Sequence, residues 1–209
     1  MENKKTPLSF NVIYWVMNVI LVLSGLIAMG TIVLYVMLWT DFFGNDLQLH
    51  VNLPGKVNYL QCGTMSLMGT DIQVELVDAS ARIHFFNTPT FLARHFFSFL
   101  MGVVALGVFT IWTFRQFIVN VRKGLTFTVS NIILLQRISY SLVGFWIIMI
   151  VYSRSAYYYI SSRVQIENVE IIEDFDNHIG ILLTALFIWV LSHIFMRGLK
   201  LQQEQDLTV

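Results

Sequence analysis

The chain has 209 residues, of which 56% are hydrophobic and 12% are charged. Because an average soluble domain carries roughly 25% charged residues, this composition excludes a water-soluble globular protein. Thirteen basic and thirteen acidic residues give a formal net charge of zero. The chain therefore has no overall basic field for direct binding of nucleic acid, and no acidic field for a cationic substrate.

Four long apolar stretches follow one another along the chain. They cover residues 12–39, 96–121, 132–151 and 179–195. Each is about long enough to cross a bilayer core of roughly 30 Å as an α-helix. The first is too long for the apolar core of a secretory signal, so we expect it to remain as an anchoring helix. The stretches predict an α-helical integral membrane protein, with four transmembrane helices in lipid and a single membrane domain over 1–209.

The connectors before the second and fourth stretches, residues 41–94 and 153–178, have the alternating pattern of β-strands. The alternating apolar positions are Leu47, Leu49, Val51, Leu53, Ile72, Val74, Leu76, Val164, Ile166, Val169 and Ile171. A lone two-stranded hairpin is only marginally stable in water. We therefore expect one small antiparallel sheet of three or more strands, built from both connectors and resting on helix ends.

Basic residues gather on the side of the predicted bundle that holds both termini. This side has eight of the thirteen bases, namely Lys4, Lys5, Arg115, Arg122, Lys123, Arg137, Arg197 and Lys200. The other side has the remaining five bases and ten of the thirteen acids. Cytoplasmic connectors of membrane proteins are rich in Lys and Arg. We therefore expect both termini in the cytoplasm and a small extracytoplasmic β-rich subdomain.

The connector over residues 122–131 predicts a tight cytoplasmic helical hairpin. Gly124 follows a basic helix end, as a C-terminal cap does, and Thr128 or Ser130 can cap the start of the next helix. Arg122 and Lys123 can contact the last carbonyls of the preceding helix and also anionic lipid head groups.

Two segments on the cytoplasmic side carry a family resemblance. The hairpin has the form Gly-x-x-Phe-Thr-x-x-Asn at Gly124, Phe127, Thr128 and Asn131, and Arg137 follows in the next helix. The chain end has Phe195, Gly198, Leu201, Glu204, Asp206, Leu207, Thr208 and Val209. From about Phe96 onward, the chain resembles an uncharacterised bacterial family of four-helix membrane proteins, domain of unknown function 2975. The resemblance implies a multi-pass protein of the bacterial inner (cytoplasmic) membrane, with a cytoplasmic helix-turn-helix transcription regulator as a partner.

These two segments are the candidate site. Its residues are Arg122, Lys123, Gly124, Phe127, Asn131, Arg137, Arg197, Gly198, Leu201, Glu204 and Asp206. In one interpretation the tail 197–209 folds back and pairs Glu204 or Asp206 with an arginine as an internal lock. In another the same residues form a docking surface for a partner, and in a third the tail is disordered.

Metal binding and catalysis have little support in the sequence. Glu173, Asp174, Asp176 and His178 are weak candidates for a metal site, since they lack the glycine turn and ligand spacing of a calcium loop. We expect no metal and no cofactor. No hydrolase or phosphate-loop motif occurs, and the four apolar stretches contain no Asp or Glu. We therefore do not expect an enzyme.

The sequence thus favours a non-catalytic inner-membrane sensor or tether that binds the cytoplasmic regulator. Two alternatives remain open. One is an accessory or scaffold subunit of a larger membrane complex, with another membrane protein or a second copy as partner. The other is a small transporter, which would need a polar lane, whereas Asn18, Ser24, Thr110 and Ser141 suit helix–helix hydrogen bonds.

Overall fold

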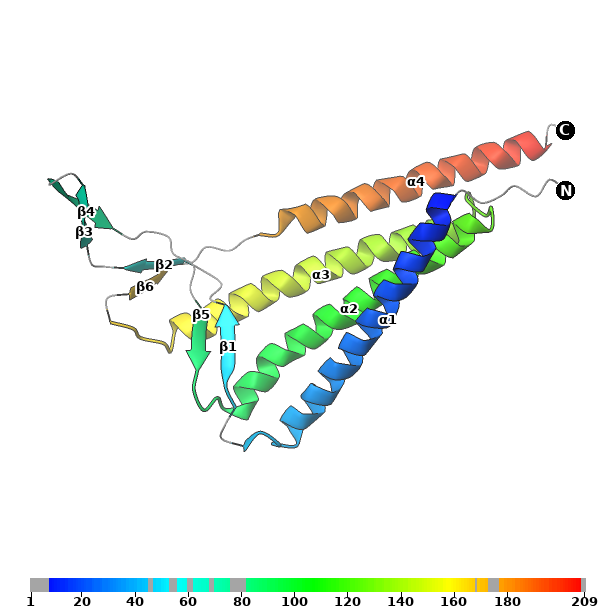
Figure 1. The fold of residues 1–209 in the computed structure, drawn as a ribbon. Coiled ribbons are helices and arrows are strands. Elements are labelled where there is room, and N and C mark those ends of the chain that lie inside the picture. The colour runs from blue at the N-terminus through cyan, green and yellow to red at the C-terminus, as the bar shows by residue number, and fades with distance from the viewer. Residues whose placement is uncertain are drawn as a thin grey trace. The chain divides into compact units, whose positions relative to one another are not determined.

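A computed structural model of the chain describes residues 8–44, 47–52, 56–59, 62–67, 70–75, 82–167, 169–172 and 177–207. These residues include four long helices, α1 (Leu8–Trp39), α2 (Thr90–Arg122), α3 (Val129–Ser161) and α4 (Ile179–Leu207) (Figure 1). All four are long and apolar enough to cross a membrane, which confirms the predicted α-helical membrane architecture. The exposed apolar side chains on these helices are surfaces for contact with the lipid bilayer.

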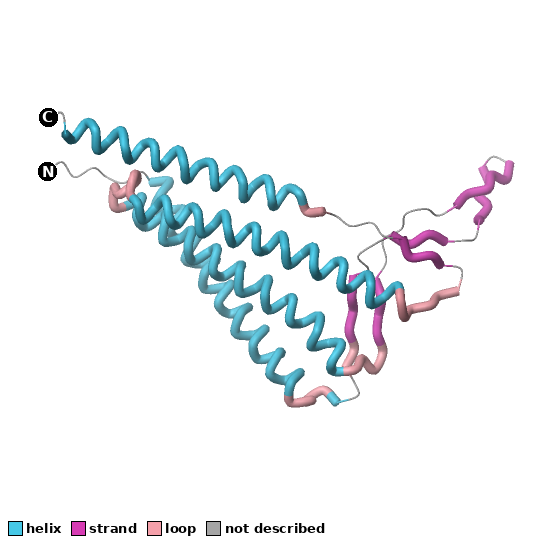
Figure 2. The backbone as a smooth tube through the Cα atoms, turned by 180° about the vertical axis from the view of Figure 1, so that it is seen from behind, coloured by secondary structure: helices cyan, strands magenta, loops and turns pink. Residues whose placement is uncertain are grey.

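The chain divides into two compact units. The helical unit comprises residues 1–36, 98–148 and 178–209, and the strand unit comprises residues 37–97 and 149–177. In the helical unit, both views place the start of α1, the turn between α2 and α3, and the end of α4 at one end (Figures 1 and 2). We call this end of the helical unit the turn end.

The helices are longer than the apolar stretches of the sequence. α3 continues ten residues past position 151, and α4 continues twelve residues past position 195. An α-helix satisfies its own backbone hydrogen bonds, so it can leave the lipid without changing its conformation. The added part of α4 contains Leu, Lys, Gln and Glu, which are good helix formers.

Polar and small residues join the helices of the helical unit. The hydroxyls of Thr110 and Ser141 are 2.8 Å apart and link α2 to α3. Ser139 donates a 2.8 Å hydrogen bond to the carbonyl of Ala185 and so links α3 to α4. α3 is the most enclosed helix. In its most apolar 18-residue stretch, 33% of the residues are buried, compared with 6% in the corresponding stretch of α1. Hydrogen bonds between hydroxyls and carbonyls are a usual way to join helices in lipid.

The described residues of the strand unit form three antiparallel strand pairs. β1 (Leu49–Asn52) pairs with β5 (Arg82–Phe85), β2 (Lys56–Tyr59) with β6 (Val169–Ile172), and β3 (Cys62–Leu67) with β4 (Thr70–Glu75). The β2–β6 pair confirms that both connectors contribute strands. The expectation of one sheet with three or more strands is wrong for the described residues, because each pair is separate. Leu53 and Leu76 lie outside the described residues.

Helix ends, rather than a third strand, cover the β1–β5 and β2–β6 pairs. The core of the strand unit combines strand residues with the first turns of α2 and the last turns of α3, at Val51, Val57, Leu92, Phe96, Ala156 and Ile160. Leu49 and Ile83 from β1 and β5, and Val169 and Ile171 from β6, pack against it. Packing on a helix gives a two-stranded ladder the apolar support that it lacks alone.

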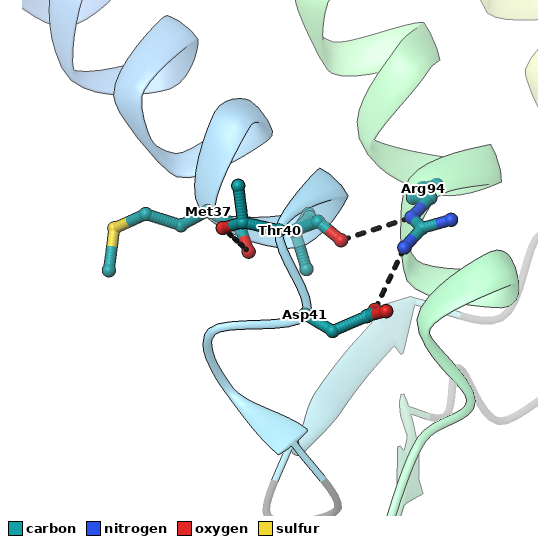
Figure 3. A network of polar contacts seen from close by, with 5 residues as sticks. Met37, Thr40, Asp41 and Arg94 are labelled. Carbon is teal, nitrogen blue, oxygen red and sulfur yellow. Dashed lines mark hydrogen bonds and ion pairs between the residues drawn. The ribbon is translucent and has the colours of Figure 1, made fainter.

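Arg94 holds the end of α1 to the start of α2 within the strand unit (Figure 3). Its Nε donates to the Leu38 carbonyl at 3.0 Å, and its Nη2 lies 2.8 Å from Asp41 Oδ1. The guanidinium carbon also lies 4.9 Å from the centre of the Trp39 ring. Arg94 thus satisfies a carbonyl that the end of a helix leaves without an intrahelical partner.

Candidate functional site

The two segments with the family pattern meet at the turn end through aromatic residues. The Phe127 ring centre lies 5.3 Å from that of Phe195, and the Phe117 ring centre lies 5.9 Å from that of Phe195. A Cβ added to Gly198 would lie 2.8 Å from two atoms of the Phe127 ring. Glycine at position 198 therefore lets this ring rest against the backbone of α4. We call Phe117, Phe127, Phe195 and Gly198 the aromatic joint.

The turn itself has a well-defined helix cap. Gly124 has a φ of +78°, and its N–H donates to the Val121 carbonyl at 3.0 Å. The N–H of Leu125 donates to the Asn120 carbonyl at 3.1 Å, which completes a Schellman motif. The predicted cap at Gly124 is thus confirmed. Thr128 is also confirmed as a cap, because its hydroxyl accepts the N–H of Asn131 at 3.4 Å.

Asn131 organises the interior of the turn. Its side chain is fully buried. The amide nitrogen Nδ2 donates to the carbonyls of Leu125 and Thr126 at 2.6 and 3.0 Å, and Oδ1 accepts from Nδ2 of Asn120 at 2.8 Å. Asn120 was not among the candidates from sequence. Both amide groups therefore help to close the turn on itself.

The cationic candidates differ in exposure and in their neighbours at the turn end. Arg122 ends α2 and its guanidinium carbon lies 4.3 Å from the centre of the Tyr14 ring, whereas Lys123 and Arg137 have exposed side chains. Arg197 lies on α4, where His193, Arg197 and Lys200 share the lining of a 390 Å³ cavity with apolar neighbours of the same helix. Arg122 therefore contacts a ring of α1, whereas Arg197 lies among residues of its own helix α4.

The sequence analysis named Asn18 as suited to helix–helix hydrogen bonds, but it missed the rest of the polar face of α1 that meets α2. Arg115 donates from Nε to Oδ1 of Asn18 at 2.6 Å, and from Nη2 to the Tyr14 hydroxyl at 3.5 Å. Asn11, Tyr14 and Asn18 are three and four positions apart, so they share one helix face. This spacing is the signal in the sequence that could have revealed them.

The chain end extends α4 rather than folding back. Residues 197–207 are helical and continue α4 in the same direction. Leu201 is 61% exposed, and the side chains from Gln202 to Gln205 are exposed as well. Glu204 therefore lies on this exposed segment, whereas the side chain of Asp206 and residues Thr208 and Val209 lie outside what the structure describes. Phe127 of the turn and Phe195 of α4 contact each other through their rings.

The weak metal candidates lie mostly outside the described residues. Only His178 of the four is described, directly before α4, where its carbonyl accepts the N–H of Ile181 at 3.0 Å. Glu173, Asp174 and Asp176 fall in the gap before it. In the described parts of the chain, no group of three or more His, Cys, Asp or Glu side chains is placed to hold a metal ion.

Comparison with protein families gives a match over most of the chain. Residues 79–209 match the model of a family described as Protein of unknown function (DUF2975). The matched region includes α2, α3 and α4. It therefore contains the turn between α2 and α3 and the end of α4, which are the two segments with the family pattern. No curated protein and no solved structure matches the chain.

Proposed function

The chain belongs to the DUF2975 family of proteins of unknown function, and we propose that it is a non-catalytic membrane tether or sensor that holds a soluble partner. The partner is a cytoplasmic helix-turn-helix transcription regulator. In this proposal the membrane is the bacterial inner membrane, and the turn end faces the cytoplasm. The excess of Lys and Arg at the turn end supports that orientation.

The exposed last turns of α4 carry the proposal. Leu201 is 61% exposed, beside exposed Gln202, Gln203 and Glu204. An exposed apolar side chain on a helix with polar neighbours suits docking into a groove of a partner. The aromatic joint lies directly before this segment and fixes where α4 leaves the bundle, because Phe127 and Phe195 are in contact there. A helix held at its base loses less conformational freedom on binding.

The lack of carboxylates in three of the four helices supports a non-catalytic role. α1, α2 and α3 contain no Asp or Glu, so they lack the carboxylates on which proton-coupled transport usually depends. A sensing role would need two states of the bundle whose populations a contact on the strand unit shifts. Each of α1, α2 and α3 has residues in both units. A change in the strand unit could therefore reach the helical unit along these continuous helices.

The test is co-purification of the regulator with the tagged full chain from membranes. Replacing Leu201 by Glu should reduce the recovered regulator about tenfold, as expected for loss of a central interface residue. Leu125→Glu is the matched control, because Leu125 is also an exposed leucine at the turn end but lies in the turn. Both variants should reach the membrane at the level of the unchanged chain.

Two results would contradict the proposal. One is recovery of the same amount of regulator with Leu201→Glu as with the unchanged chain. The other is the absence of any helix-turn-helix protein from the material that co-purifies with the unchanged chain.

A further inference from the structure

Tyr14 of α1 lies against two arginines of α2 at the turn end. The guanidinium carbon of Arg122 is 4.3 Å from the centre of the Tyr14 ring, and that of Arg115 is 5.6 Å from it. Arg115 and Arg122 are seven residues apart, which is about two helical turns, so both face α1. Lys123 follows directly in the sequence. We call Tyr14, Arg115, Arg122 and Lys123 the tyrosine–arginine cluster.

The cluster has positive charge without a nearby negative charge from its own helices. α1, α2 and α3 contain no Asp or Glu, and within the described part of the chain neither Arg115 nor Arg122 forms an ion pair. Arg115 is hydrogen-bonded to the neutral side chain of Asn18. Charged groups near the membrane are usually paired, because an unpaired charge in a low dielectric is costly.

One hydrogen-bond donor of the cluster has no acceptor. The Nε atom of Arg122 is buried and has no hydrogen-bond partner. Its guanidinium instead rests on the face of the Tyr14 ring. This cation–π contact stabilises the positive charge, but it offers Nε no hydrogen-bond acceptor. A buried charged donor without an acceptor is unfavourable. Arg122 is therefore placed for an acceptor that the described chain does not supply.

Arg122 also lines a cavity. It has a volume of 320 Å³ and is lined by Tyr14, Val119, Arg122 and Lys123. Val119 also lines a neighbouring 210 Å³ cavity, together with Arg115 and Asn120. The cavity thus combines two cationic side chains, a hydroxyl and an apolar wall. It lies at the ends of two membrane-spanning helices, which is where lipid head groups are found.

We propose that this cavity binds the phosphate group of an anionic membrane glycerophospholipid. The phosphate oxygens accept hydrogen bonds from the Arg122 guanidinium, the Lys123 ammonium and the Tyr14 hydroxyl. The planar guanidinium suits two-point contact with phosphate. The source is a lipid rather than free phosphate, because the Tyr14 ring and Val119 offer apolar contact that only a lipid would use. The site does not depend on the partner proposed for α4.

The experiment is a titration of the purified full chain, in neutral detergent, with short-chain phosphatidylglycerol and phosphatidylcholine, counting bound lipid by native mass spectrometry. The unchanged chain should bind phosphatidylglycerol more tightly. Arg122→Gln should raise the dissociation constant for phosphatidylglycerol about tenfold, the loss of a charge-assisted hydrogen bond. Arg137→Gln is the matched control, because it removes the same charge from an exposed arginine on α3, and it should change the constant less than about twofold.

Tyr14→Phe is a second variant that keeps the ring under Arg122 and removes only the hydroxyl. It should raise the same dissociation constant about threefold, since it removes one hydrogen bond. This variant carries the test if Arg122→Gln does not fold. A final arm adds inorganic phosphate in excess, which should leave the bound lipid in place.

Three results would overturn the proposal. The unchanged chain could show no preference for phosphatidylglycerol. Arg122→Gln and Arg137→Gln could weaken binding equally, which would indicate general attraction by surface charge. Inorganic phosphate could displace the lipid completely, which would assign the site to a free anion instead.

Discussion

Replacing Asn131 by Ala should destabilise the helical unit by about 3 kcal/mol. The side chain is fully buried and takes part in three hydrogen bonds, to the carbonyls of Leu125 and Thr126 and from the amide of Asn120. A typical hydrogen bond contributes about 1 kcal/mol net, so loss of all three gives the predicted value. Asn131→Asp should cost at least as much, because it places a carboxylate against two carbonyl oxygens.

The assay is reversible unfolding of the full chain in mixed micelles as the fraction of denaturing detergent rises, followed by fluorescence of the five tryptophans. Arg137→Ala is the control, since Arg137 is exposed on the same helix and its loss should change the free energy of unfolding by less than about 0.5 kcal/mol. A loss below about 1 kcal/mol for Asn131→Ala would refute the reasoning, because three buried hydrogen bonds cannot then be present.

The same assay checks two further predictions. Gly198→Ala should lower the free energy of unfolding by about 1–2 kcal/mol, because the new Cβ would overlap the Phe127 ring. Gly180→Ala is the control, because a Cβ at position 180 would have no heavy atom within 4 Å, and it should change the free energy of unfolding by less than about 0.5 kcal/mol. Equal effects of the two changes would mean that the aromatic joint is not formed. Arg94→Met should cost about 2 kcal/mol, since it removes the hydrogen bond to the Leu38 carbonyl and the contact with Trp39. Asp41→Asn should cost less than about 1 kcal/mol, because the Asp41 side chain is 62% exposed, and a larger loss than for Arg94→Met would contradict this ranking.

The helices were predictable from the sequence because membrane spans leave a strong local signal. Each predicted span lies within one helix of the structure. The ends were not predictable from hydropathy, since α3 and α4 continue into polar sequence where the helix persists without lipid. The strand pairing was predicted only in part. Alternation located β1, β4 and β6, but β1 and β2 pair with strands that lie far along the chain, and local periodicity does not identify such partners.

The turn end shows the same division between local and distant effects. The helix cap at Gly124 was predicted from local residue preferences, and the structure confirms it. The contact between Phe127 and Gly198 joins residues 71 positions apart, so periodicity alone could not predict it. The pairing of Arg115 with Asn18 joins residues that are even further apart, by 97 positions. In both cases the sequence shows each residue by itself, and only the fold shows which residue it contacts.

The exposed end of α4 can be tested directly by site-specific photo-crosslinking in living cells of the host. A photoreactive residue at Gln203, in the exposed last turns, should crosslink to a soluble helix-turn-helix regulator. The same probe at Trp112, on the exposed apolar surface of α2, should yield no such product. If position 203 yields only lipid adducts, or the same products as position 112, the proposed docking surface on α4 is contradicted.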